Sequence, residues 1–191
     1  MLTAPLLVCL DVQRAFVEPG RFHAASGTRA LMHGRRLLAY ARERRWRIAH
    51  CLLRPFAAPV SMTVQSARPV HGFEPLTREM VFERESLSAY GHEEFDRLMA
   101  SADAGAMVTG LSTSLSLLAT SIDAFERGHR LILPGEALAG PSGIEAGAPA
   151  HEAVARDIAR FLGFSVSAAE TAPMQAHPAL EAIVASKETR E

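Results

Sequence analysis

Three polar residues of this 191-residue sequence have the chemistry of a hydrolytic site and each follows an apolar run. Asp11 can give or take a proton, Arg84 can bind or stabilise an anion, and the Ser116 hydroxyl can act as a nucleophile or a hydrogen-bond partner. In an open parallel sheet, ligands bind beyond the carboxyl ends of the strands, so we expect the three side chains to meet there. The preceding apolar runs are Leu6–Leu10, Met80–Phe82 and Ala106–Thr109.

The segment around Ser116 is the most informative part of the chain. It reads VTGLSTSLSLLATSIDAFERGH over residues 108–129, where a Ser/Thr cluster precedes a predicted helix, Thr113–Arg127, that Gly128 ends. The first turn of a helix stabilises negative charge through its free N–H groups. We therefore expect an oxyanion region at Ser116, formed with the amides of Leu115 and Ser116.

Strand and helix patterns alternate along the chain, which predicts one α/β domain over residues 1–191. The apolar strands indicate a six-stranded, mostly parallel sheet that helices cover on both faces, giving three layers. Two long connections, Arg54–Thr77 and Ala139–Pro149, are either functional lids or interface arms, or surface excursions. The other predicted strands are Arg47–Leu53, Arg130–Leu133 and Phe164–Ala168, and the other predicted helices are Thr28–Trp46, His92–Ala100, Ala150–Leu162 and Pro178–Ser186.

Composition excludes several classes of partner. Apolar residues make up 48% of the chain and the net charge is −1 without long runs of like charge, which argues against nucleic acid and membrane surfaces. Cys9 and Cys51 lie inside apolar runs, so we expect buried free thiols and a cytoplasmic protein. No signal peptide or segment of transmembrane length is seen. The eight histidines have no metal-ligand spacing, so we expect neither a metal site nor a cofactor.

Four motifs resemble those of the isochorismatase-like (cysteine) hydrolases. LLVCLDVQRAF is similar to the opening Asp-x-Gln motif, RESLSAY to the Lys motif, GLSTSLS to the nucleophile motif and DAFERG to the end of the following helix. These motifs span 6–16, 84–90, 110–116 and 123–128, within a resemblance that runs from about Leu6 to Phe164. The resemblance implies the family's three-layer fold, and assembly as a homodimer or larger homo-oligomer to which the Arg54–Thr77 arm would contribute.

This sequence retains the family's residue at one of three catalytic positions and has different residues at the other two. Asp11 is retained, whereas Ser116 stands where amidase members carry the nucleophilic Cys and Arg84 where they carry Lys. A serine hydroxyl needs a general base, and an arginine cannot accept a proton, so the covalent amidase mechanism is disfavoured. Members that cleave the vinyl ether of isochorismate lack the Cys; there the Asp donates a proton and water completes hydrolysis. Metal-binding members carry an Asp and two His after the second strand, which HCLLRPFAAPVS does not offer.

These features predict a hydrolase that acts on a small anionic substrate, either a vinyl ether or an amide or imide. Asp11 is the predicted proton-transfer residue, Arg84 the electrostatic partner or carboxylate anchor, and Ser116 part of the oxyanion region. A catalytically inactive family member that binds a ligand or acts as a scaffold is the alternative, and a serine-nucleophile amidase is a third. His92 is either a base for Ser116 or a surface residue at a helix start. The remaining predicted pocket residues are Gln13, Tyr90, Ser112 and Leu115.

Overall fold

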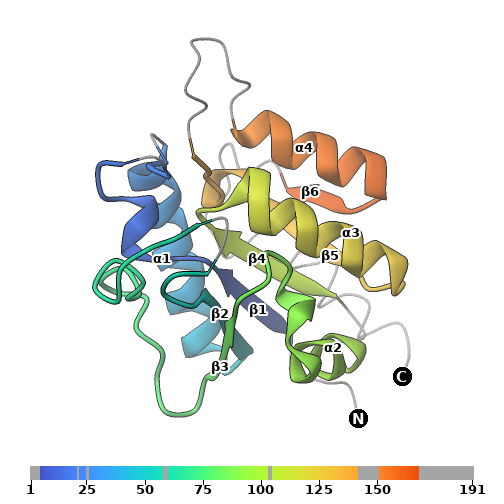
Figure 1. The fold of residues 1–191 in the computed structure, drawn as a ribbon. Coiled ribbons are helices and arrows are strands. Elements are labelled where there is room, and N and C mark those ends of the chain that lie inside the picture. The colour runs from blue at the N-terminus through green and yellow to red at the C-terminus, as the bar shows by residue number, and fades with distance from the viewer. Residues whose placement is uncertain are drawn as a thin grey trace.

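A six-stranded parallel sheet forms the centre of the computed structural model, which describes residues 5–20, 22–24, 26–57, 60–102, 105–141 and 151–167 (Figure 1). The strand order is β3-β2-β1-β4-β5-β6, and every neighbouring pair is parallel. The order reverses between β1 and β4, where such sheets bind ligands. The strands are β1 (Leu6–Leu10), β2 (Arg47–Leu53), β3 (Met80–Arg84), β4 (Ala106–Gly110), β5 (Leu131–Pro134) and β6 (Ser165–Ser167).

Helices cover both faces of the sheet. One apolar core lies between the sheet and α1, and a second lies between the sheet and the group of α2, α3 and α4, on the other side in Figure 1. Successive side chains of a strand point to opposite faces of the sheet, so those of β1, β2 and β4 alternate between the two cores. These strands are therefore buried on both faces. The α-helices are α1 (Gly27–Glu43), α2 (Glu93–Ala100), α3 (Leu118–Glu126) and α4 (His151–Leu162). Short 3₁₀ turns cover Arg14–Phe16, Ala89–Gly91 and Gly135–Ala137, and a π-type turn covers Thr113–Leu117.

The structure confirms the predicted fold class, with two differences that matter for the site. β3 is two residues longer than predicted, so Arg84 is its last residue. The helix predicted over Thr113–Arg127 is divided into the π-type turn and α3. The predicted helix Pro178–Ser186 lies outside the described residues. Within the described ranges, no helix has both the length and the apolar character that crossing a bilayer requires.

The connection after β2 packs against the α1 side of the sheet. Six of its apolar side chains are buried in the α1-side core although they have no period in the sequence. The antiparallel bridge between Gln13 and Pro69 ties this connection to the chain that follows β1. The buried members are Ala57, Val60, Met62, Ala67, Val70 and Phe73.

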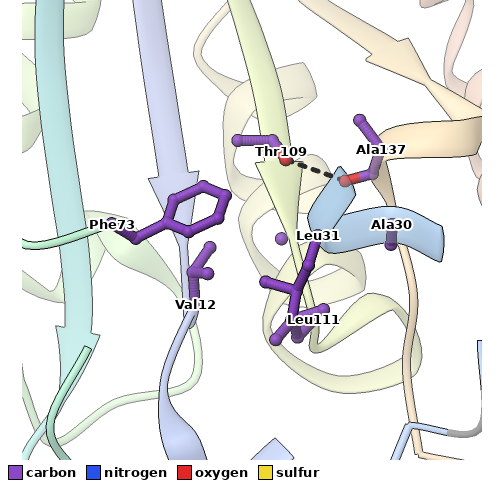
Figure 2. A pocket seen from close by; sticks show the side chains of 8 residues that line it. Val12, Ala30, Leu31, Phe73, Thr109, Leu111 and Ala137 are labelled. Atoms are coloured by element: carbon purple, nitrogen blue, oxygen red, sulfur yellow. Dashed lines mark hydrogen bonds between the residues drawn. The ribbon is translucent and has the colours of Figure 1, made fainter. Parts of the chain in front are cut away.

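Close packing leaves a narrow crevice between α1 and the end of β4, too small for a water molecule. Figure 2 shows Phe73, Val12 and Leu31 around it, with Thr109 Oγ1 donating to the Ala137 carbonyl at 2.8 Å. The α1 backbone passes close to this crevice at Gly34, where a Cβ would lie 2.6 Å from Thr109 Oγ1 and 3.0 Å from Phe73.

Gly34→Ala is expected to destabilise the protein although alanine is the better helix former. Overpacking against the Thr109 hydroxyl and the Phe73 ring is expected to cost about 1–3 kcal/mol, which outweighs a propensity gain of about 1 kcal/mol. Urea unfolding would measure the change. Gly135→Ala is the control, because a Cβ there meets no atom within 4 Å. A stabilised Gly34→Ala protein would contradict the packing.

Candidate active site

Asp11 and Arg84 form a buried ion pair at the carboxyl ends of β1 and β3. Arg84 Nη2 donates to Asp11 Oδ1 at 2.6 Å, and the two side chains are 1% and 0% exposed. Strand β2 lies between β1 and β3, so the Arg84 side chain, the hydrogen bond and the Asp11 side chain together bridge two strand spacings, about 10 Å. Asp11 adopts a left-handed conformation with φ of 53°, which is uncommon outside glycine and is typical of functional sites when tertiary contacts enforce it.

The environment of Asp11 favours a retained proton more than water does. Burial raises the pKa of the Asp11 carboxyl above its ordinary value, and the Arg84 charge and the Ser116 and Ser112 hydroxyls oppose that shift without cancelling it. Two polar atoms of the pair, Asp11 Oδ2 and Arg84 Nε, have no well-aligned hydrogen-bond partner among the described residues. Arg84 Nη1 donates to the Ser86 carbonyl at 2.6 Å. The buried ion pair therefore keeps hydrogen-bonding capacity at one carboxylate oxygen and at one N–H group.

The turn after β4 brings Ser112 and Ser116 to the same place. Gly110 lets the end of β4 lie close to the end of β1, because a Cβ there would lie 2.3 Å from the Leu10 carbonyl oxygen. In the π-type turn, the Leu117 amide donates to the Ser112 carbonyl at 3.0 Å. The Ser112 hydroxyl donates to Ser116 Oγ at 3.4 Å, and both serines are buried. The structure thus brings Asp11, Arg84, Ser116 and Ser112 together.

The amides expected to bind an oxyanion already have an acceptor. The Leu115 amide donates to the Ser112 carbonyl at 3.3 Å, and the Ser116 amide donates to Ser112 Oγ at 3.4 Å. Both bonds are long and therefore weak. An oxyanion at this place would have to compete with Ser112 for these donors.

Gln13 lies near the site, but its side chain is used by the backbone. Gln13 Nε2 donates to the carbonyls of Leu53 at 2.8 Å and Ala67 at 2.6 Å, and Oε1 accepts from the Leu53 amide at 3.0 Å. The side chain therefore joins the ends of β1 and β2 to the connection after β2. The sequence prediction placed Gln13 in the pocket as a substrate contact, and the structure gives it this joining role instead.

Gln13→Ala is expected to lower the free energy of unfolding by about 2–4 kcal/mol, because three buried backbone groups lose their partner. Thermal or urea unfolding would measure the loss. Gln65→Ala provides the control, since Gln65 is exposed on the same connection. Equal stability of the two variants would contradict the assigned role of Gln13.

The side chains of Tyr90 and His92 make their contacts with residues outside the Asp11–Arg84 pair. The Tyr90 hydroxyl bonds to His129 Nδ1 at 2.8 Å, and the Arg127 guanidinium lies 4.7 Å from the ring centroid. The His92 ring packs on Phe82 at 5.1 Å between centroids. Leu115 is half-buried against the α1-side core. These three predicted or possible pocket residues therefore have structural contacts of their own.

Comparison with known proteins identifies the family. Residues 5–168 match the model of the isochorismatase domain. The chain belongs to the isochorismatase family. No curated protein matches it significantly.

Solved structures of other proteins share the fold. An isochorismatase from Pseudomonas putida superposes with a TM-score of 0.70 at 21% identity, covering 86% of this chain and 87% of the other. An isochorismatase hydrolase from Oleispira antarctica gives 0.76 at 16% identity, with 96% and 98% covered. N-carbamoylsarcosine amidase from Thermoplasma acidophilum gives 0.71 at 17% identity, with 89% and 99% covered. This membership places the chain among the isochorismatase-like hydrolases.

A second buried polar cluster of this isochorismatase-family chain was not predicted. Glu79, just before β3, accepts from Arg42 Nε at 2.8 Å and Nη2 at 2.9 Å and from the Leu76 amide at 3.0 Å, and bonds to His50 Nε2 at 2.8 Å. It joins α1 to β2 and β3. The available signal was His50, a polar residue inside the apolar strand IAHCLL.

The free thiols are buried and unreactive. Burial raises the pKa of Cys51 to about 12 and raises the pKa of Cys9 further, so neither forms a thiolate near neutral pH. Among the residues that the structure describes, no group of three or more His, Cys, Asp or Glu side chains could hold a metal ion.

Proposed function

We propose that this isochorismatase-like hydrolase cleaves a small anionic substrate by proton transfer through Asp11, without a covalent enzyme intermediate. The observation that carries the proposal is the one-sided Asp11–Arg84 pair, bonded through Oδ1 and Nη2 at 2.6 Å. It leaves a carboxylate oxygen and an N–H group without a well-aligned hydrogen-bond partner in the described chain. The oxygen suits a proton transfer, and the N–H suits a carboxylate or carbonyl oxygen of the substrate.

The chemistry balances for either predicted substrate. With a vinyl ether, Asp11 gives its proton to the alkene carbon, and water adds to the carbon that bears the ether oxygen. The C–O bond then breaks to give a carbonyl compound and an alcohol. One proton of the added water goes to the leaving oxygen, and the other returns Asp11 to its starting form. With an amide or imide, Asp11 takes a proton from attacking water and passes it to the leaving nitrogen. One relative of the same fold is named as an amidase.

Ser116 is not proposed as the nucleophile. Its hydroxyl needs a base. Asp11, the carboxylate beside it, is assigned here to the attacking water, and the Arg84 guanidinium cannot accept a proton. In the amide or imide route, Ser116 instead lines the place where negative charge develops on the carbonyl oxygen of the substrate.

A panel of amides, imides and vinyl ethers with carboxylate groups tests the mechanism. The wild type is expected to turn over at least one class, and Ser116→Ala is expected to retain activity within about tenfold, because only a hydrogen bond is lost. Intact-mass measurement during turnover should show no adduct. An acyl group on Ser116 would refute the non-covalent mechanism and favour the serine-nucleophile amidase.

A catalytically inactive family member is the second candidate. The observation in its favour is that Ser112 already occupies the Leu115 and Ser116 amides. It predicts no wild-type turnover across the panel, together with a gain of amidase activity in the Ser116→Cys, Arg84→Lys double variant. Wild-type turnover would exclude it.

We also propose a cytoplasmic homodimer or larger homo-oligomer. The two free thiols suit a reducing compartment, and the family resemblance implies assembly. Light scattering of the purified chain measures the oligomeric state, and a monomeric mass would refute the assembly.

A further inference from the structure

The contacts of the buried Gln13 side chain bring three arginines of the chain into one region. Gln13 bonds to Leu53 and Ala67, and each of the three residues joined in this way is followed by an arginine: Arg14, Arg54 and Arg68. The Gln13 contacts thus bring arginines from three separate segments to one region. Arg54 and Arg68 are exposed and Arg14 is half-buried.

This region lies at the edge of the sheet that carries the candidate active site. The Arg54 amide donates to the Arg84 carbonyl at 2.9 Å. Arg14 is three residues beyond Asp11, a stretch of chain that spans at most about 10 Å. An anionic group held there would be within reach of a small molecule whose other end contacts Asp11.

The backbones of Arg14 and Arg68 are directly joined. The Arg14 amide donates to the Arg68 carbonyl at 3.0 Å, beside the antiparallel bridge between Gln13 and Pro69. Like charges at opposed positions of paired backbones repel each other. An anion that lies between two arginines on neighbouring backbone positions stabilises both, because each guanidinium can form charge-assisted hydrogen bonds to it.

The charges of Arg14 and Arg68 are not balanced by a partner within the described ranges. Neither guanidinium has a hydrogen bond or ion pair there, whereas Arg54 lies 3.4 Å from Glu85 and 3.8 Å from Glu83. Arg14 and Arg68, unlike Arg54, therefore have guanidinium groups that can bind an anionic ligand in this region.

We propose that Arg14 and Arg68 form a subsite for a carboxylate or phosphate group of the substrate, remote from the bond that Asp11 cleaves. This selects small molecules with an anionic group at the end away from that bond. The link to the substrate rests on the proposed function, whereas anion binding by the pair does not.

Calorimetric titration with inorganic phosphate, at an ionic strength matched with sodium chloride, tests the subsite directly. The full-length wild type is expected to bind phosphate saturably. The Arg14→Gln, Arg68→Gln double variant should bind it at least about tenfold more weakly, since two charged contacts are lost. Arg68→Gln alone should show an intermediate loss. Arg36→Gln, on the exposed side of α1, is the matched control and should bind as the wild type does.

Phosphate binding no stronger than chloride binding in the wild type, or unchanged binding in the double variant, would overturn the subsite. Asp11→Asn should bind phosphate normally, so loss of turnover in that variant and loss of anion binding are separate results. With a cleaved substrate in hand, the double variant should raise KM at least about tenfold while kcat stays within about twofold. If the double variant loses phosphate binding but keeps the wild-type KM, the pair binds free anions only. That result would overturn its role in substrate binding.

Discussion

Replacing Glu79 with alanine is expected to lower the free energy of unfolding by about 3 kcal/mol, because it leaves the buried His50 and the partly buried Arg42 without their partner. The Glu79 side chain is 2% exposed and makes four hydrogen bonds that join α1 to the β2–β3 edge. Burial alone would raise its pKa, but hydrogen bonds from Arg42, the Leu76 amide and His50 outweigh burial and hold the pKa at about 2.

The low pKa of Glu79 also sets a pH dependence. The folded pKa is depressed below the ordinary value of 4.5, so this stabilisation is complete above about pH 4.5 and is lost as the pH falls toward 2. Urea unfolding at pH 7 and pH 3 should therefore show a smaller difference between wild type and Glu79→Ala at the lower pH. Glu94→Ala, an exposed acid on α2, is the control and should change stability by less than about 0.5 kcal/mol at either pH. A Glu79 variant as stable as this control would contradict the role of the cluster.

The sheet was predictable because its strands are short apolar runs. β1 and β2 have the predicted bounds, since an apolar run buried on both faces ends where polar residues begin. β3 was predicted too short because Glu83 and Arg84 are charged. Arg84 is buried in the strand only because Asp11, 73 positions away, supplies its counter-charge. No local pattern contains that information.

The connection after β2 shows the limit of pattern reading. Its buried side chains, such as Val60 and Phe73, cover the α1-side core without a helical or strand period. Their burial depends on the Gln13 contacts to Leu53 and Ala67, which join distant segments. The sequence spacing therefore predicted that this connection is a lid, an interface arm or a surface excursion. In the structure, tertiary contacts bury part of it against the α1-side core.

The location of the candidate site was predictable, but several side-chain roles were not. Parallel strands end at one edge, so Asp11, Arg84 and Ser116 were expected to converge, and they do. Gln13 and Tyr90 were predicted as pocket residues, and each stands in the family-like motif that contains Asp11 or Arg84. Their polar atoms instead bond to groups far along the chain, at Leu53 and His129.

Asp11→Asn is expected to reduce kcat/KM by about 10²–10⁴-fold, because the amide cannot transfer the proton. Asparagine fits the position, since it has the same shape and tolerates the left-handed backbone that Asp11 adopts. The change leaves the Arg84 charge without its counter-ion, so thermal unfolding should accompany the assay to show that the variant is folded at the assay temperature. Asp157→Asn, on the exposed side of α4, is the control and should keep wild-type turnover.

The most direct test of the proton-transfer role is therefore kcat/KM of folded Asp11→Asn on whichever vinyl ether, amide or imide the wild type cleaves. The mechanism predicts a loss of at least about a hundredfold, with the Asp157→Asn control unchanged. Wild-type kcat/KM in the folded Asp11→Asn protein would show that the carboxyl at this position does no chemistry and would contradict the mechanism.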